Sequence, residues 1–161
     1  FKQNFAFISP KLEPLQFSAN LSLIRSRARL AEEELNFTRL TDPQHEDVRP
    51  LFGQSPYIVN TMLSYTNDST GWSTALSFNV QGEKLILIYV GGAPDIYQQP
   101  QPTLDFTLRK LFKNNIQLGF KAQNILAPDN RKTYEFKGEL YDWNTFNLGR
   151  TYSFSIAYRI K

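Results

Sequence analysis

The end of the chain alternates strictly between large apolar side chains and small or polar ones. From Tyr152 to Ile160, every second residue is aromatic or aliphatic, and serine, alanine and arginine stand between them. A β-strand turns successive side chains to opposite faces, so this segment predicts a strand with one apolar and one polar face. Soluble sheets contain such strands. Transmembrane barrels also contain them, with the apolar face toward lipid and aromatic residues near the membrane interfaces.

The composition excludes several functional classes. The 161 residues include no cysteine, which excludes disulfides, thiolate chemistry and zinc–cysteine sites. The net charge of +3 comes from interspersed acidic and basic residues, whereas a nucleic-acid-binding surface needs clustered Lys and Arg. No apolar run approaches the ~20 residues of a membrane-spanning helix. Because the chain begins at Phe1 with no initiator Met or signal peptide, we expect a mature, processed or partial chain.

The same alternation recurs along the chain, in segments mostly long enough, at roughly 9–11 residues, to cross a bilayer when tilted. The sequence predicts seven antiparallel strands, at residues 1–8, 15–24, 57–66, 72–89, 103–112, 116–123 and 152–161.

The connections between these strands alternate in length. The short ones are 9–14, 67–71 and 113–115, and the longer ones are 25–55, 90–101 and 128–147. Outer-membrane barrels show this pattern, because their periplasmic turns are short and their extracellular loops are long. We therefore interpret the fold as all-β, with the short turns periplasmic and the long loops extracellular.

Aromatic residues gather at the strand ends beside the short turns, which predicts an interfacial girdle. The girdle candidates are Tyr65, Trp72, Phe112 and Tyr158, with Phe7 and Phe17 nearby. Seven strands cannot close a membrane barrel, and an open edge in lipid leaves backbone groups unpaired at several kcal/mol each. We expect the missing strands to come from an upstream segment or from another chain.

Several segments resemble the C-terminal strands of TonB-dependent outer-membrane receptors of the Bacteroidetes type. Residues 49–60 read Arg-Pro-Leu-Phe-Gly-Gln-Ser-Pro-Tyr-Ile-Val-Asn, and residues 149–153 read Gly-Arg-Thr-Tyr-Ser. Residues 79–83, 104–110 and 121–126 match the family in order and spacing, so the resemblance covers about residues 15–161. The chain departs from the family at its end, where Ile160 and Lys161 replace the usual terminal aromatic residue.

The resemblance implies that residues 1–161 form about seven C-terminal strands of a 22-stranded barrel closed by a plug domain. It implies a place in the bacterial outer membrane and uptake of a scarce nutrient, such as a ferric siderophore. The implied partners are the lipid bilayer with its lipopolysaccharide, the upstream strands, the plug, and a surface lipoprotein. TonB would act through an N-terminal part that this sequence does not include. No cofactor and no nucleic acid is implied.

We find no set of residues that predicts an enzyme or a metal site. The sequence contains no His-Glu-x-x-His, Gly-x-Ser-x-Gly or phosphate-loop motif. The lone histidine, His45, lies in a polar stretch and is expected to be solvated. Glu32, Glu33 and Glu34 could bind a cation, but a solvated run of charges is the more common case.

Two groups of polar residues are candidates for the lumen or for substrate contact. Arg25, Arg27 and Arg29 share one face of an extended segment and would attract anionic substrates if they faced the lumen mouth. The alternatives are a charged strand extension above the membrane, or a short helix over residues 31–35. The second group would face the lumen on adjacent strands and contact the plug or line the wall; it comprises Asp105, Arg109, Lys121 and Gln123.

Two other functions fit the same alternation. A receptor-like barrel can serve as a scaffold subunit of a larger outer-membrane assembly. A soluble β-barrel can hold a small apolar ligand inside. The direction of the apolar face distinguishes the soluble barrel from a membrane receptor. Phe154 would be internal in a soluble barrel and would contact lipid in a receptor.

Overall fold

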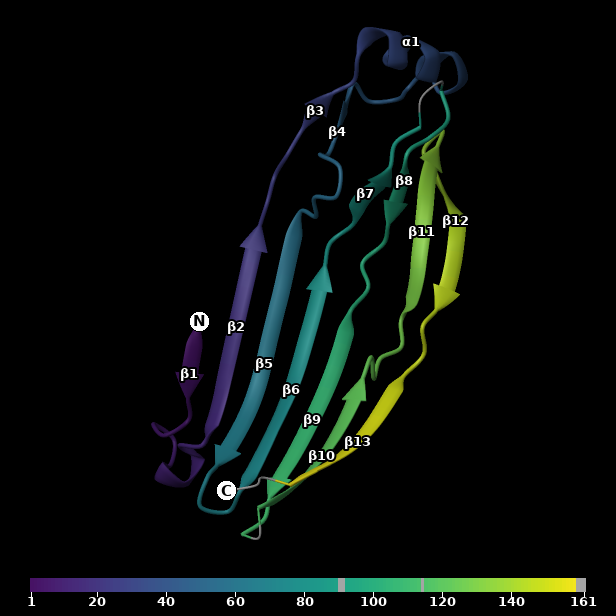
Figure 1. Ribbon diagram of the computed structural model, residues 1–161. Helices are drawn as coiled ribbons and strands as arrows, with labels where there is room; N and C mark the ends of the chain where they lie inside the picture. The colour runs from purple at the N-terminus through teal and green to yellow at the C-terminus, as the bar shows by residue number, and fades with distance from the viewer. Residues whose placement is uncertain (90–91, 114, 159–161) are drawn as a thin grey trace.

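The computed structural model describes residues 1–89, 92–113 and 115–158. Figure 1 shows a tall wall of strands with a single labelled helix at one end. The predicted loop 90–101, turn 113–115 and strand 152–161 include residues 90, 91, 114 and 159–161, which lie outside the described residues. Among the residues described, no helix has the length and apolar content needed to cross a bilayer.

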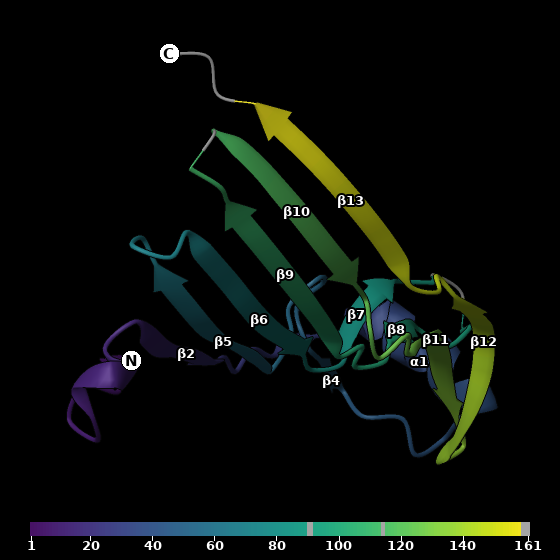
Figure 2. The ribbon, with the colours of Figure 1, turned by 90° about the horizontal axis from the view of Figure 1, so that it is seen from below.

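The main sheet has seven strands in the order β1-β2-β5-β6-β9-β10-β13, and every neighbouring pair is antiparallel. This confirms the all-β antiparallel class. The strands form an open sheet, with β1 and β13 at its two edges (Figures 1 and 2). Their bounds are β1 Lys2–Asn4, β2 Leu15–Leu23, β5 Tyr57–Asn67, β6 Trp72–Gln81, β9 Thr103–Leu111, β10 Ile116–Gln123 and β13 Thr151–Tyr158.

The long connections between the strands of the main sheet contain secondary structure of their own, at the end of the molecule opposite the short turns. A four-stranded sheet in the order β12-β11-β8-β7 stands beyond the main sheet (Figure 1). It comprises β7 Lys84–Leu87, β8 Ile96–Gln98, β11 Asp129–Phe136 and β12 Glu139–Asn147. The remaining elements are β3 Ala28–Arg29, α1 Glu32–Thr41, β4 Val48–Arg49, and a single 3-10 turn, η1 Pro10–Leu12. We call the end with α1 the helix end and the end with the short turns the turn end.

The predicted fourth strand, 72–89, is wrong in its second half. The strand β6 ends at Gln81, where the Gly82 N–H donates a 2.9 Å hydrogen bond to the Tyr57 carbonyl. A side chain at position 82 would collide with the Tyr57 ring. Glycine, which has no side chain, allows the backbone to pass close to this ring. The chain then leaves the main sheet and enters β7.

The expected long loops at 90–101 and 128–147 are also partly strand. The clearest case is the hairpin of β11 and β12, joined by Lys137 and Gly138 with φ of 55° and 79°. Two residues with positive φ make the turn that matches the twist of a hairpin. The predicted loop therefore contains two paired strands, with a register shift between Lys132 and Thr133, that the alternation of apolar residues does not predict.

Two shorter expectations need correction. The first predicted strand, 1–8, is reduced to β1, because the chain turns at Phe5 and continues into η1 at Pro10. The suggested helix at 31–35 exists but is longer, as α1. Glu32, Glu33 and Glu34 occupy its first turn, where acidic side chains favour the positive end of the helix dipole.

The registers join the apolar positions of the strands into one continuous face. One row runs across six strands through residues paired directly opposite one another: Phe17, Leu63, Leu76, Phe106, Ala122 and Tyr152. The row on the other face, next along the strands, is polar or small: Gln16, Ser64, Ala75, Thr107, Lys121 and Ser153. The predicted strand alternation therefore holds across the sheet.

Little of this chain is packed into an interior. Among the described residues, the buried hydrophobic side chains are Leu85, Ile96 and Ala122. The exposed surface is 11243 Å², whereas a compact monomer of 18.6 kDa exposes roughly 8,200 Å². The difference is roughly 3,000 Å² of surface that a self-contained domain of this size would bury.

Candidate functional site

The apolar face of the main sheet is a prominent chemical feature, and among the described residues many of its large side chains are exposed. At the β13 edge, Phe154 is 82% exposed and Ile156 is 79% exposed. The ring of Phe120 on β10 lies 5.0 Å from that of Phe154 and 6.3 Å from that of Phe106 on β9. The rings pack along the sheet surface and leave their outer sides open.

The four girdle candidates lie together at the turn end. Tyr65 and Trp72 flank the β5–β6 turn, Phe112 follows β9, and Tyr158 ends β13 opposite Ile116. Their residue positions are those predicted, at one end of the apolar face. A contact with a membrane interface stays a prediction.

Lys110 is a feature that the sequence analysis missed. It stands on the apolar face, opposite Trp72, and its Nζ lies 4.6 Å from the centre of the Trp72 ring and 5.7 Å from that of Phe112. The Nζ also donates a 2.6 Å hydrogen bond to the carbonyl of Thr70 in the turn. The charge is thus carried to the turn end, as expected of a lysine that extends from an apolar surface to water. The sequence did contain a signal for this, because Lys110 alternates with Leu108 and Phe112 and so falls on the apolar face of its strand.

The second group of candidates lies on the polar face of the main sheet, and contact with a lumen or a plug stays a prediction. Asp105 and Arg109 are on β9, and Lys121 and Gln123 are on the adjacent β10. No ion pair joins them among the residues described. The Asp105 carboxylate instead accepts a 2.8 Å hydrogen bond from the Asn124 N–H, where the backbone takes a φ of 54°. Asp105 therefore holds the chain where β10 ends, which is a structural role.

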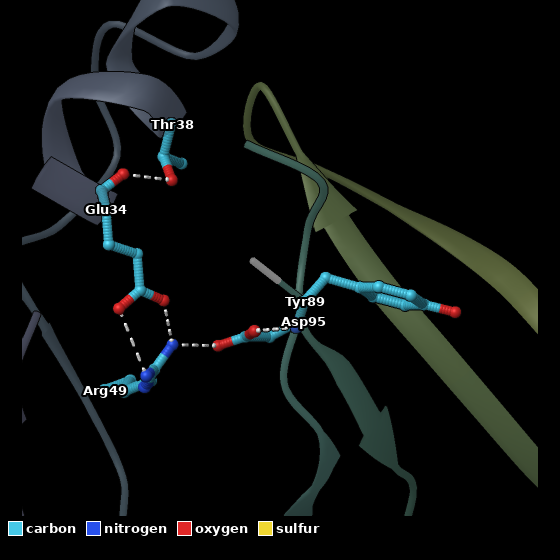
Figure 3. A network of polar contacts seen from close by, with 5 residues as sticks. All are labelled: Glu34, Thr38, Arg49, Tyr89 and Asp95. Carbon is cyan, nitrogen blue, oxygen red and sulfur yellow. Dashed lines mark hydrogen bonds and ion pairs between the residues drawn. The ribbon is translucent and has the colours of Figure 1, made fainter. Parts of the chain in front are cut away.

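At the helix end, Arg49 joins three elements into what we call the Arg49 clamp. Its guanidinium lies 2.6 Å from the Glu34 carboxylate on α1 and 3.2 Å from that of Asp95, just before β8 (Figure 3). These side chains are 11–18% exposed. Burial opposes the charge on the guanidinium, but the hydrogen bond to Glu34 and the charge of Asp95 raise the pKa of Arg49 above its ordinary value.

Further hydrogen bonds extend the clamp into the backbone. The Thr38 hydroxyl donates to the Glu34 carbonyl, and Asp95 accepts a 3.2 Å bond from the Tyr89 N–H (Figure 3). The Thr41 hydroxyl donates to the Gly92 carbonyl at 3.4 Å. The helix α1 is thereby attached to the β7–β8 hairpin at two points, although the helix and the hairpin lie far apart in the sequence.

A polar hollow of ≈ 480 Å³ lies beside the clamp. Its lining includes Arg49, His45, Tyr97 and the carboxylates of Glu83 and Glu135. Burial, together with the charges of Asp95 and Glu83, raises the pKa of Tyr97 to about 12. In the described part of the chain, no group of three or more His, Cys, Asp or Glu residues is placed to hold a metal ion.

A second, smaller hollow lies under the motif at residues 49–60. Ser55 is 4% exposed, and its Oγ has no hydrogen-bond partner among the described residues, nor has the Oε1 of Gln54. The hollow is also bordered by Arg25 and Tyr97.

The three arginines lie after the end of β2 and in β3, and all three are exposed. Exposed and half-buried residues alternate without a break from Leu21 to Leu30, and Arg25, Arg27 and Arg29 are among the exposed ones, as are Leu21 and Leu23. None of them has a hydrogen bond or ion pair with a described residue.

Comparisons with protein-family models, with curated proteins and with solved structures found no match. The geometry of the chain's own residues therefore carries the functional argument. Two surfaces emerge from it: a bare apolar face on the main sheet, and a polar helix end held together by Arg49.

Proposed function

We propose that the chain is the C-terminal part of the barrel of a TonB-dependent outer-membrane receptor, which takes up a scarce nutrient such as a ferric siderophore. The barrel would stand in a bacterial outer membrane with the turn end in the periplasm and the helix end outside. An upstream plug would close it, and TonB would act on that plug.

One observation carries this proposal: the apolar face spans the main sheet and is left bare. Water is a poor solvent for such a surface, since each Å² left exposed forgoes about 25 cal/mol of transfer free energy. A face of this kind needs an apolar cover, and acyl chains supply one without any further protein. Lys110, the basic residue that interrupts the face, stands at the turn end with its charge directed to the turn, where a membrane interface would lie.

The edges of the sheet support the same assignment. The outer edges of β1 and β13 are without a neighbouring strand among the described residues. In a bilayer such edges are tolerated only when they are paired, because water is absent there to satisfy backbone groups. The proposal therefore requires further strands at both edges, which a 22-stranded barrel provides.

The polar face would line the lumen, and the helix end would form part of the extracellular surface. Arg109 and Lys121 are exposed on the polar face, so they are available to ion-pair with a plug. The clamp would hold α1 and the hairpins in a fixed arrangement over the mouth. In this proposal, residues 1–161 would contribute part of the barrel wall, part of the lumen lining and part of the extracellular surface.

The soluble-barrel alternative is less well supported. It needs Phe154 and its neighbours inside a closed, dry interior, whereas among the described residues the buried hydrophobic side chains are only Leu85, Ile96 and Ala122. A scaffold role remains the second candidate, favoured by β12. Every residue of that edge strand is exposed, including Tyr141, Trp143 and Phe146, so a partner such as a surface lipoprotein has an edge and aromatic side chains to contact.

Uptake by the full-length receptor tests the proposal. Cells that express it as their sole receptor would be given radiolabelled ferric siderophores, with and without TonB and with and without a protonophore. We expect uptake of at least one siderophore that stops when either energy source is removed. Uptake that continues without TonB would contradict a TonB-dependent receptor. An intact surface-exposed barrel that takes up none of them would contradict transport and favour the scaffold.

A further inference from the structure

Three asparagines lie directly opposite one another on the polar face of the main sheet. Asn20 on β2 pairs with Asn60 on β5, and Asn60 pairs with Asn79 on β6. These three strands stand side by side, and the asparagines cross them toward the helix end (Figure 1). Residues directly opposite each other in an antiparallel pair share a face, so the three side chains form one row, which we call the asparagine row. Neighbouring strands are about 4.8 Å apart, so the row spans about 10 Å.

The amides of the asparagine row are partly unused within the chain. The Asn79 Nδ2 donates a hydrogen bond to the Asn60 Oδ1. The side chain of Asn20 has no hydrogen bond to a described residue, and neither the Asn60 Nδ2 nor the Asn79 Oδ1 has one. Asn20 is exposed, and the other two are half-buried. Because a carboxamide carries two N–H donors and an acceptor oxygen, the row offers both kinds of hydrogen bond to a ligand.

The wall around the asparagine row is uncharged. From Gln16 on β2 to Gln81 on β6, none of the polar-face positions of β2, β5 and β6 is occupied by Asp, Glu, Lys or Arg. The neighbouring row toward the turn end begins at Lys2 on β1 and ends at Asp105 on β9, so its two charges are opposite in sign. Arg109 lies further toward the turn end. An anion held against the asparagine row would therefore lose hydration without gaining a cation in exchange.

We propose that the asparagine row binds an electrically neutral iron(III) chelate of the tris-hydroxamate kind, in preference to an anionic chelate such as a tris-catecholate. This inference rests on the proposed function, because it takes the polar face as the lumen wall and a ferric siderophore as the substrate. Three hydroxamates balance the charge of iron(III), whereas three catecholates leave the complex strongly anionic. Hydroxamate oxygens accept hydrogen bonds, which the N–H groups of the row supply.

The test measures binding of both chelates to the full-length receptor in detergent, by isothermal titration calorimetry. We expect the wild type to bind the tris-hydroxamate more tightly, by about tenfold or more, the factor that 1.4 kcal/mol represents. The double change Asn60→Ala, Asn79→Ala removes both partners of their mutual hydrogen bond, so it leaves neither amide without its partner. It should weaken tris-hydroxamate binding about 25-fold, from roughly fivefold for each hydrogen bond lost to the ligand.

Two further variants separate binding from folding. Ser64→Ala, Ser73→Ala alters the same face of the same two strands, about 13–20 Å nearer the turn end, and should leave both affinities unchanged. Asn79→Lys places a cation in the row and should tighten tris-catecholate binding about tenfold while weakening tris-hydroxamate binding. A misfolded barrel would lose both chelates, so a reversal of preference reports on the row itself.

The outcomes separate this inference from the proposed function. A wild type that binds the tris-catecholate as tightly as the tris-hydroxamate overturns the inference and favours attraction of anions by Arg25, Arg27 and Arg29. TonB-dependent uptake of that anionic chelate would leave the proposed function standing. Unchanged tris-hydroxamate binding in Asn60→Ala, Asn79→Ala also overturns the inference. An intact receptor that takes up no ferric siderophore of either kind overturns the proposed function, and the inference with it.

Discussion

The Nζ of Lys110 lies 4.6 Å from the centre of the Trp72 ring, on the strand opposite. The same Nζ bonds to the Thr70 carbonyl, so the charge is held by the ring on one side and by the turn on the other. A lysine on the apolar face is thereby kept at its rim. This pair marks where the apolar surface ends and polar surroundings begin.

A double-mutant cycle measures the Lys110–Trp72 contact. We expect Lys110→Met and Trp72→Leu to show a coupling of about 0.5–1 kcal/mol in the free energy of unfolding, because a cation over an exposed indole ring gains that much. The measurement is urea unfolding of the full-length barrel from vesicles. The neighbouring Lys113 has no such contact, so Lys113→Met should show no coupling with Trp72. A coupling of equal size for both lysines would mean that general charge effects, not the ring, account for it.

The two faces of β13 differ in the cost of an added charge. Phe154→Arg should lower the free energy of unfolding in vesicles by about 2–4 kcal/mol, the cost of arginine on a lipid face near the midplane. Ser155→Arg, one residue along, should cost much less because Ser155 shares the polar face with Lys121. Similar losses from both changes would contradict the assigned faces.

Removing Arg49 should loosen the helix end without opening the main sheet. Arg49→Met leaves two half-buried carboxylates facing each other, at a cost of about 1.5–3 kcal/mol, the range for hydrogen bonds to charged groups. Hydrogen exchange should rise in α1 and stay unchanged in β5 and β9. The matched control is Arg131→Met, since Arg131 pairs with Asp142 in an exposed position and should contribute about 0–1 kcal/mol. Unchanged exchange in α1 would show that the clamp holds nothing.

The pKa of Tyr97 gives a prediction at high pH. Its folded value of about 12 lies above the ordinary value of 10.0, so the folded state holds the phenolic proton more tightly than the unfolded chain does. That contribution to stability is complete below pH 10.0 and is lost as the pH rises through about 12. Phenolate absorbance should show one step near pH 12 that is missing in Tyr97→Phe. If the absorbance step that Tyr97→Phe removes lies near pH 10 instead, the Tyr97 ring is not buried as described.

The alternation of side chains was enough to predict most of the main sheet. The sixth predicted strand, 116–123, has the bounds of β10, and β2, β5 and β9 agree with their predicted positions to within a residue or so. Strands with one apolar and one polar face have a strong period-2 signal, because each face meets a different environment. That is why the polar positions of Asp105, Arg109, Lys121 and Gln123 could also be predicted.

The helix end lacked such a signal. Every residue of β12 is exposed, so its two faces meet the same surroundings and the sequence need not alternate. The hairpin turn at Lys137 and Gly138 was the one local cue to the ladder. The Arg49 clamp joins residues 15 and 46 positions apart, and nothing local in the sequence pairs them. The side of Arg25, Arg27 and Arg29 depended on whether the strand bulged after Leu23, and the sequence left that open; in the structure β2 ends at Leu23 and all three arginines are exposed.

The central claim is that the apolar face contacts lipid, and the chain's lack of cysteine permits a direct measurement. Single cysteines at positions 152 to 158 of the full-length receptor would carry a spin label in vesicles. The accessibility of each label to oxygen, which partitions into lipid, is compared with that to a water-soluble nickel chelate. We predict high oxygen accessibility at 152, 154, 156 and 158, and high nickel accessibility at the positions between. Labels at 154 and 156 that are shielded from both reagents, in a receptor that remains in water, would contradict the account.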